Sequence, residues 1–417
     1  MPINYGRLLV SGIMTFSLLA TCESCRPDAE RATNFPKTNT LPATAVVNPV
    51  DSTASVPDSA VSAPPASDSA AMARTSLVVR EYRRYVGTVG TVPVVLELTG
   101  ADSIRGSYYY QGRGGLLTLS AARPAAGQPL VLRETDDTGS LTGRWQTQQP
   151  FGPTLRGAWR SPDGRRQFPF ALREDYAGAV RYSIETYSSY SKSKDCGLGD
   201  GRTHITSEEQ DVVYLRPHLT AAEAKVQRQL LPAPHSQLQQ YFDKQLRSSG
   251  ACRELKKLAW VTYNADFLLS IQTFEHEFNV GTPHPVGYYY HTTFDLRTGR
   301  PLELGELLRA GFKMPLRRLL SAHLRTDSLY VDFYRAEIEG DSAQTRWPLG
   351  PDGEPLAPLP QNGYYLMPSG IGFQYDMYEI APYVYGPILV EISYREIKPL
   401  LRPDGPLAQL LQRRGLR

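Results

Sequence analysis

Residues 260–302 read WVTYNADFLLSIQTFEHEFNVGTPHPVGYYYHTTFDLRTGRPL, and this stretch decides the fold of the C-terminal half of the chain. Runs rich in aromatic and β-branched residues are typical of strands, whereas Asn, Asp and Gly mark the turns between them. We therefore expect two strands joined by a turn at Asn264 and Asp266. A third strand over 286–296 and a hairpin at 297–302 should follow.

The sequence on both sides of this stretch predicts helices and further strands. DVVYLRPHL at 211–219 is typical of a strand, and Thr220 with Glu223 forms a capping box that opens a helix ending near Leu231. Apolar residues at helical spacing predict a second helix at Leu238, Phe242 and Leu246 and a later one at Leu316, Leu319, Leu320 and Leu324. Three closing strands, at 364–368, 370–375 and 388–394, precede a short helix at 396–401. Residues 176–417 should thus form an α+β domain with a mostly antiparallel sheet and helices on one side.

Residues 76–175 predict a separate, small all-β domain. Three segments, SIRGSYYY, SLTGRWQT and TLRGAWRS, share the order apolar, any residue, Gly, any residue, aromatic. A period of two places the three marked residues of each segment on one face of a strand, and the Gly leaves space for a neighbouring ring. We expect an antiparallel meander of about eight strands, curled or closed as a small barrel.

The aromatic residues of this domain allow two interpretations. In the first, they line the mouth of a ligand-holding barrel, and the residues concerned are Tyr108, Tyr109, Tyr110, Trp145 and Trp159. In the second, they are the core, because any small β fold packs aromatic residues at period two. The second interpretation is the more economical.

The N-terminal segment predicts export. A 13-residue apolar run at 8–20 follows Arg7 and is too short to span a bilayer, so residues 1–21 are interpreted as a signal peptide. Leu19 to Cys22 resemble the lipobox of bacterial lipoproteins, which would make Cys22 the lipidated residue and anchor the exported chain to a membrane, in the periplasm or at the cell surface. An ordinary secreted protein is the alternative. Residues 22–75, rich in Pro, Ser and Ala, predict a disordered tether.

Composition and motifs argue against several classes of function. The chain has 417 residues, 41% of them hydrophobic, which is typical of a folded protein. Its 45 Lys and Arg against 42 Asp and Glu give a net charge of only +3, which disfavours a nucleic-acid binder. None of the seven histidines has a partner at metal-ligand spacing and no catalytic motif occurs, so we expect no metal, no cofactor and no enzyme.

Two cysteines lie in the C-terminal domain, Cys196 and Cys252. An exported location favours a disulfide between them, and a catalytic thiol is the alternative.

The C-terminal domain resembles a known extracytoplasmic domain. The matching elements are Ser270-Ile271 at a strand end, a Gly-x-x-His-Pro loop at 281–285, Phe294-Asp295-Leu296, and the signature Tyr-Glu-Ile-Ala-Pro-Tyr at 378–383 with Gly386. Over about residues 205–401 they are similar to the domain shared by RsiV-type anti-sigma factors and PdaC-type peptidoglycan deacetylases, a domain of unknown function. The resemblance implies that fold. In the family, the RsiV-type member captures a lysozyme.

This sequence departs from both named members. It shows no anti-sigma segment, and it lacks the paired-Asp motif and the metal-binding His pair of the deacetylase. The resemblance therefore implies a binding module of the envelope for a lysozyme-like muramidase or peptidoglycan. The alternative is a glycan or acyl hydrolase whose carboxylate pair forms only in three dimensions. The candidate ligand-binding residues are His284, Tyr289, Tyr378, Glu379 and Tyr383. The alternative for His284 and the signature tyrosines is a role in packing alone.

Overall fold

The computed structural model describes residues 74–112, 115–194, 196, 202–248, 252–331, 347 and 349–416. The signal peptide at 1–21 and the lipidated Cys22 lie outside these residues, so both stay predictions. The tether at 22–75 also lies outside them, except that residues 74 and 75 already belong to the first strand. Within the described residues, no helix has both the length and the apolar character needed to cross a membrane.

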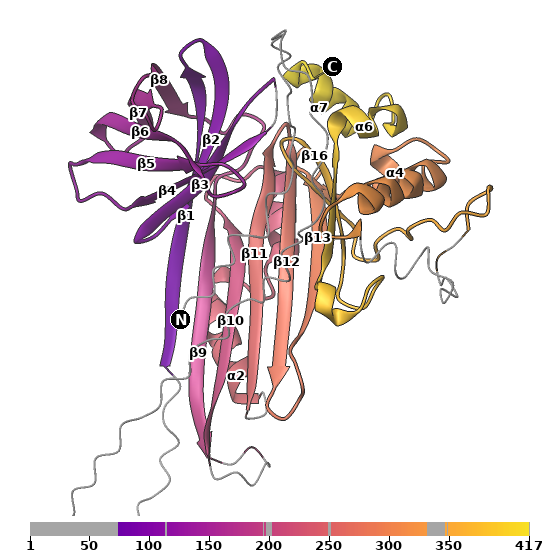
Figure 1. Ribbon diagram of the computed structural model, residues 1–417. Coiled ribbons are helices and arrows are strands. Elements are labelled where there is room, and N and C mark those ends of the chain that lie inside the picture. Colours follow the sequence, from indigo (N-terminus) through magenta and orange to yellow (C-terminus); the bar gives the residue numbers. More distant parts are fainter. Residues whose placement is uncertain are drawn as a thin grey trace, which may run out of the picture. The chain divides into compact units, whose positions relative to one another are not determined.

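The first eight strands form a closed antiparallel barrel, as the sequence predicts (Figure 1). Strand β1 closes it by pairing with both β2 and β8. The strands are β1 (Arg74–Val89), β2 (Val92–Gly100), β3 (Ser103–Tyr110), β4 (Leu116–Ala122), β5 (Pro129–Thr135), β6 (Leu141–Pro150), β7 (Thr154–Arg160) and β8 (Gln167–Glu174). Tyr85, Tyr108 and Trp145 are fully buried in the barrel core.

The Gly-aromatic motif works by close approach of a ring to the backbone. A Cβ added at Gly143 would lie 2.3 Å from Nε1 of Trp159, so only glycine leaves room for that ring. Trp159 is itself buried, as is Tyr109, and only Tyr110 of the five aromatic candidates is partly exposed. Tyr108, Trp145 and Trp159 therefore belong to the barrel core, with Tyr110 packed against it, whereas the ring of Tyr109 lies under the guanidinium group of Arg414.

Strand β1 also belongs to a second, larger array of strands. Its first half, Arg74–Glu81, pairs with β9. The hydrogen-bonded strands of the barrel and of the large sheet therefore form one continuous series. The further strands are β9 (Tyr182–Lys194), β10 (Thr203–Leu215), β11 (Arg253–Ala265), β12 (Leu268–Asn279), β13 (Val286–Asp295) and β14 (Arg300–Pro301). A fragment that began at Tyr176 would lack β1 and expose the edge of β9.

The large sheet is antiparallel except at β10 and β11, which run parallel. Parallel strands need a long crossover, and here α1 (Ala221–Leu230), η2 (His235–Gln237) and α2 (Leu238–Ser248) supply it. The capping box predicted at Thr220 and Glu223 is present at the start of α1. The α+β class and the mostly antiparallel sheet are thus confirmed.

The C-terminal residues build a second, three-stranded sheet with short helices around it. Its elements are α3 (Leu304–Leu307), α4 (Lys313–Thr326), β15 (Tyr364–Leu366), β16 (Gly370–Tyr375), η4 (Tyr383–Tyr385), β17 (Ile388–Ser393), α6 (Tyr394–Ile397), η5 (Lys398–Leu400) and α7 (Pro406–Arg414). Leucines of α4 and α7 join the strands in one core cluster. The sequence analysis missed α7, although Pro406 at its first turn and Gly415 after its end are the expected boundary signals.

The predicted disulfide between Cys196 and Cys252 is present. It links the segment after β9 to the residue that precedes β11. The backbone N–H of Cys252 also donates to Oγ1 of Thr206 at 2.6 Å. The crosslink therefore fixes one end of the large sheet.

Candidate functional site

The structure brings His284, Tyr378 and Tyr383 together from segments almost 100 residues apart. The rings of His284 and Tyr383 stack with centroids 4.1 Å apart, and the Tyr378 hydroxyl donates to Nε2 of His284 at 3.2 Å. On the other side of the imidazole, Nδ1 donates to the carbonyl of Pro285 at 3.0 Å. The Tyr383 hydroxyl donates to the same carbonyl at 3.2 Å. Both nitrogens of His284 are thus used to hold the loop at 281–285 against the loop at 376–386, which we call the signature loop.

The signature loop presents apolar side chains to solvent. Val384 is 84% exposed and Tyr378 is 59% exposed, and Tyr385 is also exposed. Tyr378 has a φ of 67°, a left-handed conformation that costs a non-glycine residue about 1–2 kcal/mol. The fold maintains this outward position because the Tyr378 hydroxyl is held by His284. We call Tyr378, Val384, Tyr385 and the His284–Tyr383 pair the signature face.

Glu379, expected to face a ligand, instead braces the signature loop. Its two carboxylate oxygens accept the backbone N–H groups of Gln361 and Asp376, each at 2.9 Å. Asp376 acts in the same way, because it accepts the backbone N–H of Tyr289 at 2.8 Å and the side-chain amide of Asn362. Burial raises the pKa of both carboxyl groups. All four oxygens already have donors, so this pair supports the loop rather than acid–base chemistry.

Tyr289 points inward, contrary to its proposed role as a surface anchor. Side chains alternate across β13, and this register buries Tyr289 against Phe274, with centroids 4.5 Å apart. The exposed rings of this run are Tyr288 and Tyr290. Tyr289 contributes its backbone N–H, which anchors Asp376, and not its ring.

A buried polar layer lies behind the signature loop. His291 donates from Nδ1 to the carbonyl of Asn362 at 3.0 Å and accepts at Nε2 from the Gln272 amide at 3.1 Å. Because Nε2 faces a donor and the ring is buried, the neutral form is favoured, and burial lowers the pKa of His291 to about 4. The imidazole stacks on Tyr365, 5.1 Å away, and Tyr365 in turn faces Glu391 of β17.

Glu391 gives this layer a testable pH dependence. Burial raises its pKa to about 7, against 4.5 for an ordinary Glu. As pH rises, the Glu391 carboxyl group therefore loses its proton at lower pH in the unfolded chain than in the folded one. The contribution of Glu391 to the free energy of unfolding falls by about 3 kcal/mol as pH rises from 4.5 to 7. We expect Glu391→Gln to leave stability nearly unchanged at about pH 4 and to raise it by about 3 kcal/mol at about pH 8.

Urea unfolding of both proteins across that range measures the difference directly. In the difference between the unfolding free energies of variant and wild type, the contributions of all other titrating groups cancel. His291 is one of them, and its lowered pKa makes stability rise with pH, opposite to the effect of Glu391. A constant difference over the whole pH range would contradict the buried, protonated state of Glu391.

The described residues offer little else that resembles a reaction centre. They contain no group of three or more His, Cys, Asp and Glu side chains arranged to hold a metal ion. One hollow of about 440 Å³ lies around Arg181 and Arg216, and a second of about 510 Å³ lies on the barrel. Neither is lined by a predicted ligand-binding residue. Sequence reasoning missed Val384 and Asp376, although both lie within or beside the signature motif that drew attention to Tyr378.

Comparisons with known proteins identify one domain. Residues 309–395, which include α4, the three-stranded sheet and the signature loop, match a family described as "Protein of unknown function (DUF3298)". This family carries no assigned enzymatic activity. The resemblance to RsiV-type and PdaC-type proteins over about residues 205–401 stays a prediction. No curated protein matches the sequence.

Solved structures similar to the chain include two DUF3298 family members. A DUF3298 family member from Bacteroides fragilis is 16% identical with a TM-score of 0.39, covering 56% of this chain and 99% of that one. A DUF3298 family protein from Pseudomonas aeruginosa is 18% identical with a TM-score of 0.36, covering 53% of this chain and 94% of that one.

Proposed function

We propose that this chain is an exported, lipid-anchored binding module of the bacterial envelope, and that its signature face binds a lysozyme-like protein. The observation that carries the proposal is the outward position of Tyr378 and Val384. Exposed aromatic and aliphatic side chains on a rigid base are typical anchors of protein interfaces. The stacked His284–Tyr383 pair supplies that rigid base.

The RsiV-type resemblance supports the class of partner. The matching signature, Tyr378 to Tyr383 with Gly386, is the segment that forms the signature face. A protein partner fits this face better than peptidoglycan does, because no polar hollow for a sugar ring adjoins it among the hollows described above. The hydrolase alternative has less support, since the neighbouring carboxylates of Asp376 and Glu379 are held by backbone donors.

Calorimetric titration of the complete chain with a c-type lysozyme tests the proposal. The complete chain is needed because β1 pairs with β9. We expect Val384→Asp to weaken binding by about tenfold or more, since a charge would be desolvated at the centre of the interface. Tyr378→Ala should act in the same direction.

Tyr288→Ala is the matched control, because Tyr288 is an exposed tyrosine on the face of β13 opposite to the ring of Tyr289. It should leave the affinity unchanged. If lysozyme gives no heat while soluble peptidoglycan fragments bind, or if Val384→Asp binds lysozyme like the wild type, the proposed function is wrong.

A further inference from the structure

Four arginines form one row across the outer surface of the barrel. The strand register pairs Arg105 of β3 with Ser120, Ser120 with Arg133 of β5, Arg133 with Arg144 of β6, and Arg144 with Arg160 of β7. All five side chains are exposed. Because paired residues share a face and strands lie about 4.8 Å apart, this arginine row extends about 19 Å over five strands.

The row is unfavourable for the barrel alone. Like charges directly opposite each other on neighbouring strands destabilise a sheet, and Arg133, Arg144 and Arg160 are three such neighbours. Among the described residues, Arg105, Arg133 and Arg144 form no ion pair with a carboxylate, and Arg160 bonds only the neutral amide of Gln167, at 2.9 Å. A bound anion would relieve this repulsion.

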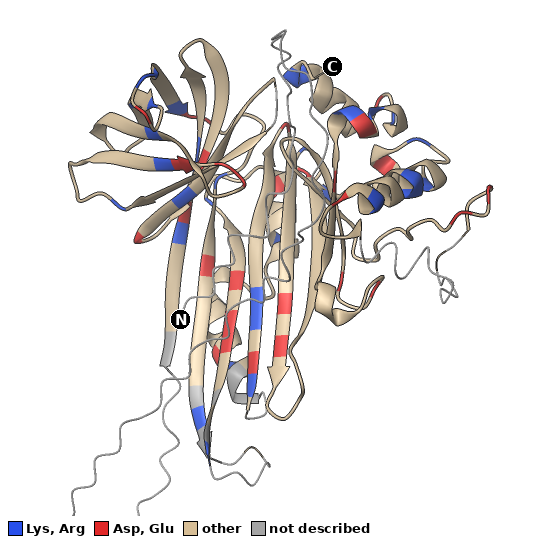
Figure 2. Cartoon of the chain, in the orientation of Figure 1, with Lys and Arg blue, Asp and Glu red and all other residues tan. Residues whose placement is uncertain are grey.

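The strands that carry the row add no exposed acidic residue. Within β3 to β7 the one acidic residue is Glu134, and its carboxylate is buried inside the barrel. The nearby aspartates lie in turns, where Asp136 and Asp163 accept hydrogen bonds from their own turn residues. Figure 2 shows the resulting blue bands on the barrel strands.

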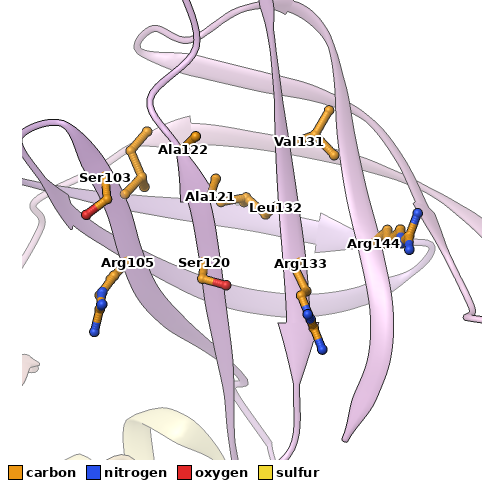
Figure 3. A pocket seen from close by; sticks show the side chains of 10 residues that line it. Ser103, Arg105, Ser120, Ala121, Ala122, Val131, Leu132, Arg133 and Arg144 are labelled. Carbon is orange, nitrogen blue, oxygen red and sulfur yellow. The ribbon is translucent and has the colours of Figure 1, made fainter. Parts of the chain in front are cut away.

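A hollow between two of the arginines gives the row a recess. Small residues, Ser120 and Ala122, separate Arg105 from Arg133 and leave a space of about 510 Å³, within the range of ligand pockets. Figure 3 shows Arg105, Ser120 and Arg133 side by side on adjacent strands, with both arginine side chains extending to the same side. Three guanidinium groups, of Arg105, Arg133 and Arg144, and the hydroxyls of Ser103 and Ser120 line the recess as donors. Guanidinium groups pair with carboxylates through two parallel hydrogen bonds.

We propose that the arginine row binds a carboxylate-bearing polysaccharide, whose successive acidic sugars pair with successive arginines. A flexible chain can follow the outer curve of a closed barrel, whereas a flat bilayer would meet only part of the row. Membrane-surface binding also requires large apolar side chains, and single-stranded nucleic acid requires exposed rings for stacking. The exposed residues beside the row are Ser120, Ala122, Val131 and Gln146, of which only Val131 is a large apolar side chain and none is aromatic. This inference does not depend on the function proposed for the signature face.

Titration of the complete chain with polygalacturonate tests the proposal. We expect binding that weakens markedly between about 50 and about 200 mM salt, because charge neutralisation drives it. The double variant Arg133→Gln/Arg144→Gln should bind about 100-fold more weakly, from two lost charge-assisted contacts. Lysines at both positions should restore part of the affinity, since the charge is kept but the paired hydrogen bonds are not.

Arg165→Gln is the matched control. Arg165 lies in a turn of the same barrel, and its side chain is 87% exposed. Its replacement removes one positive charge, as does each substitution in the row. The control should bind polygalacturonate as the wild type does, and neutral dextran should not bind at all. Equal affinities of the double variant and the wild type, or binding only to vesicles containing anionic phospholipid, would overturn the proposal. Circular dichroism confirms that each variant is folded.

Discussion

Replacing Glu134 with leucine is expected to lower the free energy of unfolding by about 3–5 kcal/mol. Glu134 is 2% exposed and lies in the barrel core. Its Oε2 accepts the indole N–H groups of Trp145 and Trp159, each at 2.7 Å, and its Oε1 accepts the Thr142 hydroxyl at 2.9 Å. Leucine would leave both buried indole donors without an acceptor, and an unsatisfied buried polar group is costly.

Urea unfolding followed by tryptophan fluorescence measures this loss. Glu134→Gln is the matched control, because an amide oxygen in the position of Oε2 still accepts both indole N–H groups. It should cost less than the leucine substitution, since no buried indole donor loses its acceptor. A leucine variant within about 1 kcal/mol of the wild type would show that the barrel does not depend on this carboxylate.

Removing the disulfide should cost about 4 kcal/mol, because Cys196 and Cys252 are 56 residues apart and the crosslink restricts the unfolded chain. We expect the Cys196→Ser/Cys252→Ser variant to unfold at lower urea concentration than the oxidised wild type. Wild type treated with a reducing agent should match the variant. If the variant and the oxidised wild type unfold at the same urea concentration, the crosslink does not stabilise the native state.

Local patterns in the sequence predicted much of the fold. Period-two alternation and the Gly-aromatic motif predicted the eight-stranded barrel, and Thr220 with Glu223 predicted the start of α1. Each of these signals involves residues near in sequence. The sharing of β1 between the barrel and the large sheet could not be predicted, because both pairings join residues about 80–115 positions apart, as in Val86 with Arg173 and Leu77 with Tyr187.

The candidate site was predicted in part. The Gly-x-x-His-Pro loop identified His284, the signature motif identified Tyr378 and Tyr383, and the structure brings these three together. The signature motif did not show that Glu379 turns inward, because that depends on backbone donors from Gln361 and Asp376. The arginine row could not be predicted either. Its successive members are 11 to 28 residues apart in sequence, and only the strand register brings them side by side.

We propose that the signature face is the binding surface of this protein. Hydrogen–deuterium exchange of the complete chain, with and without a c-type lysozyme, shows where the partner binds. We expect slower exchange in the presence of lysozyme at residues 376–386 and 281–286, with the outer strands β3 to β7 unchanged. Protection that leaves 376–386 unaffected while it appears elsewhere, or no protection at all, would show that the signature face does not bind lysozyme.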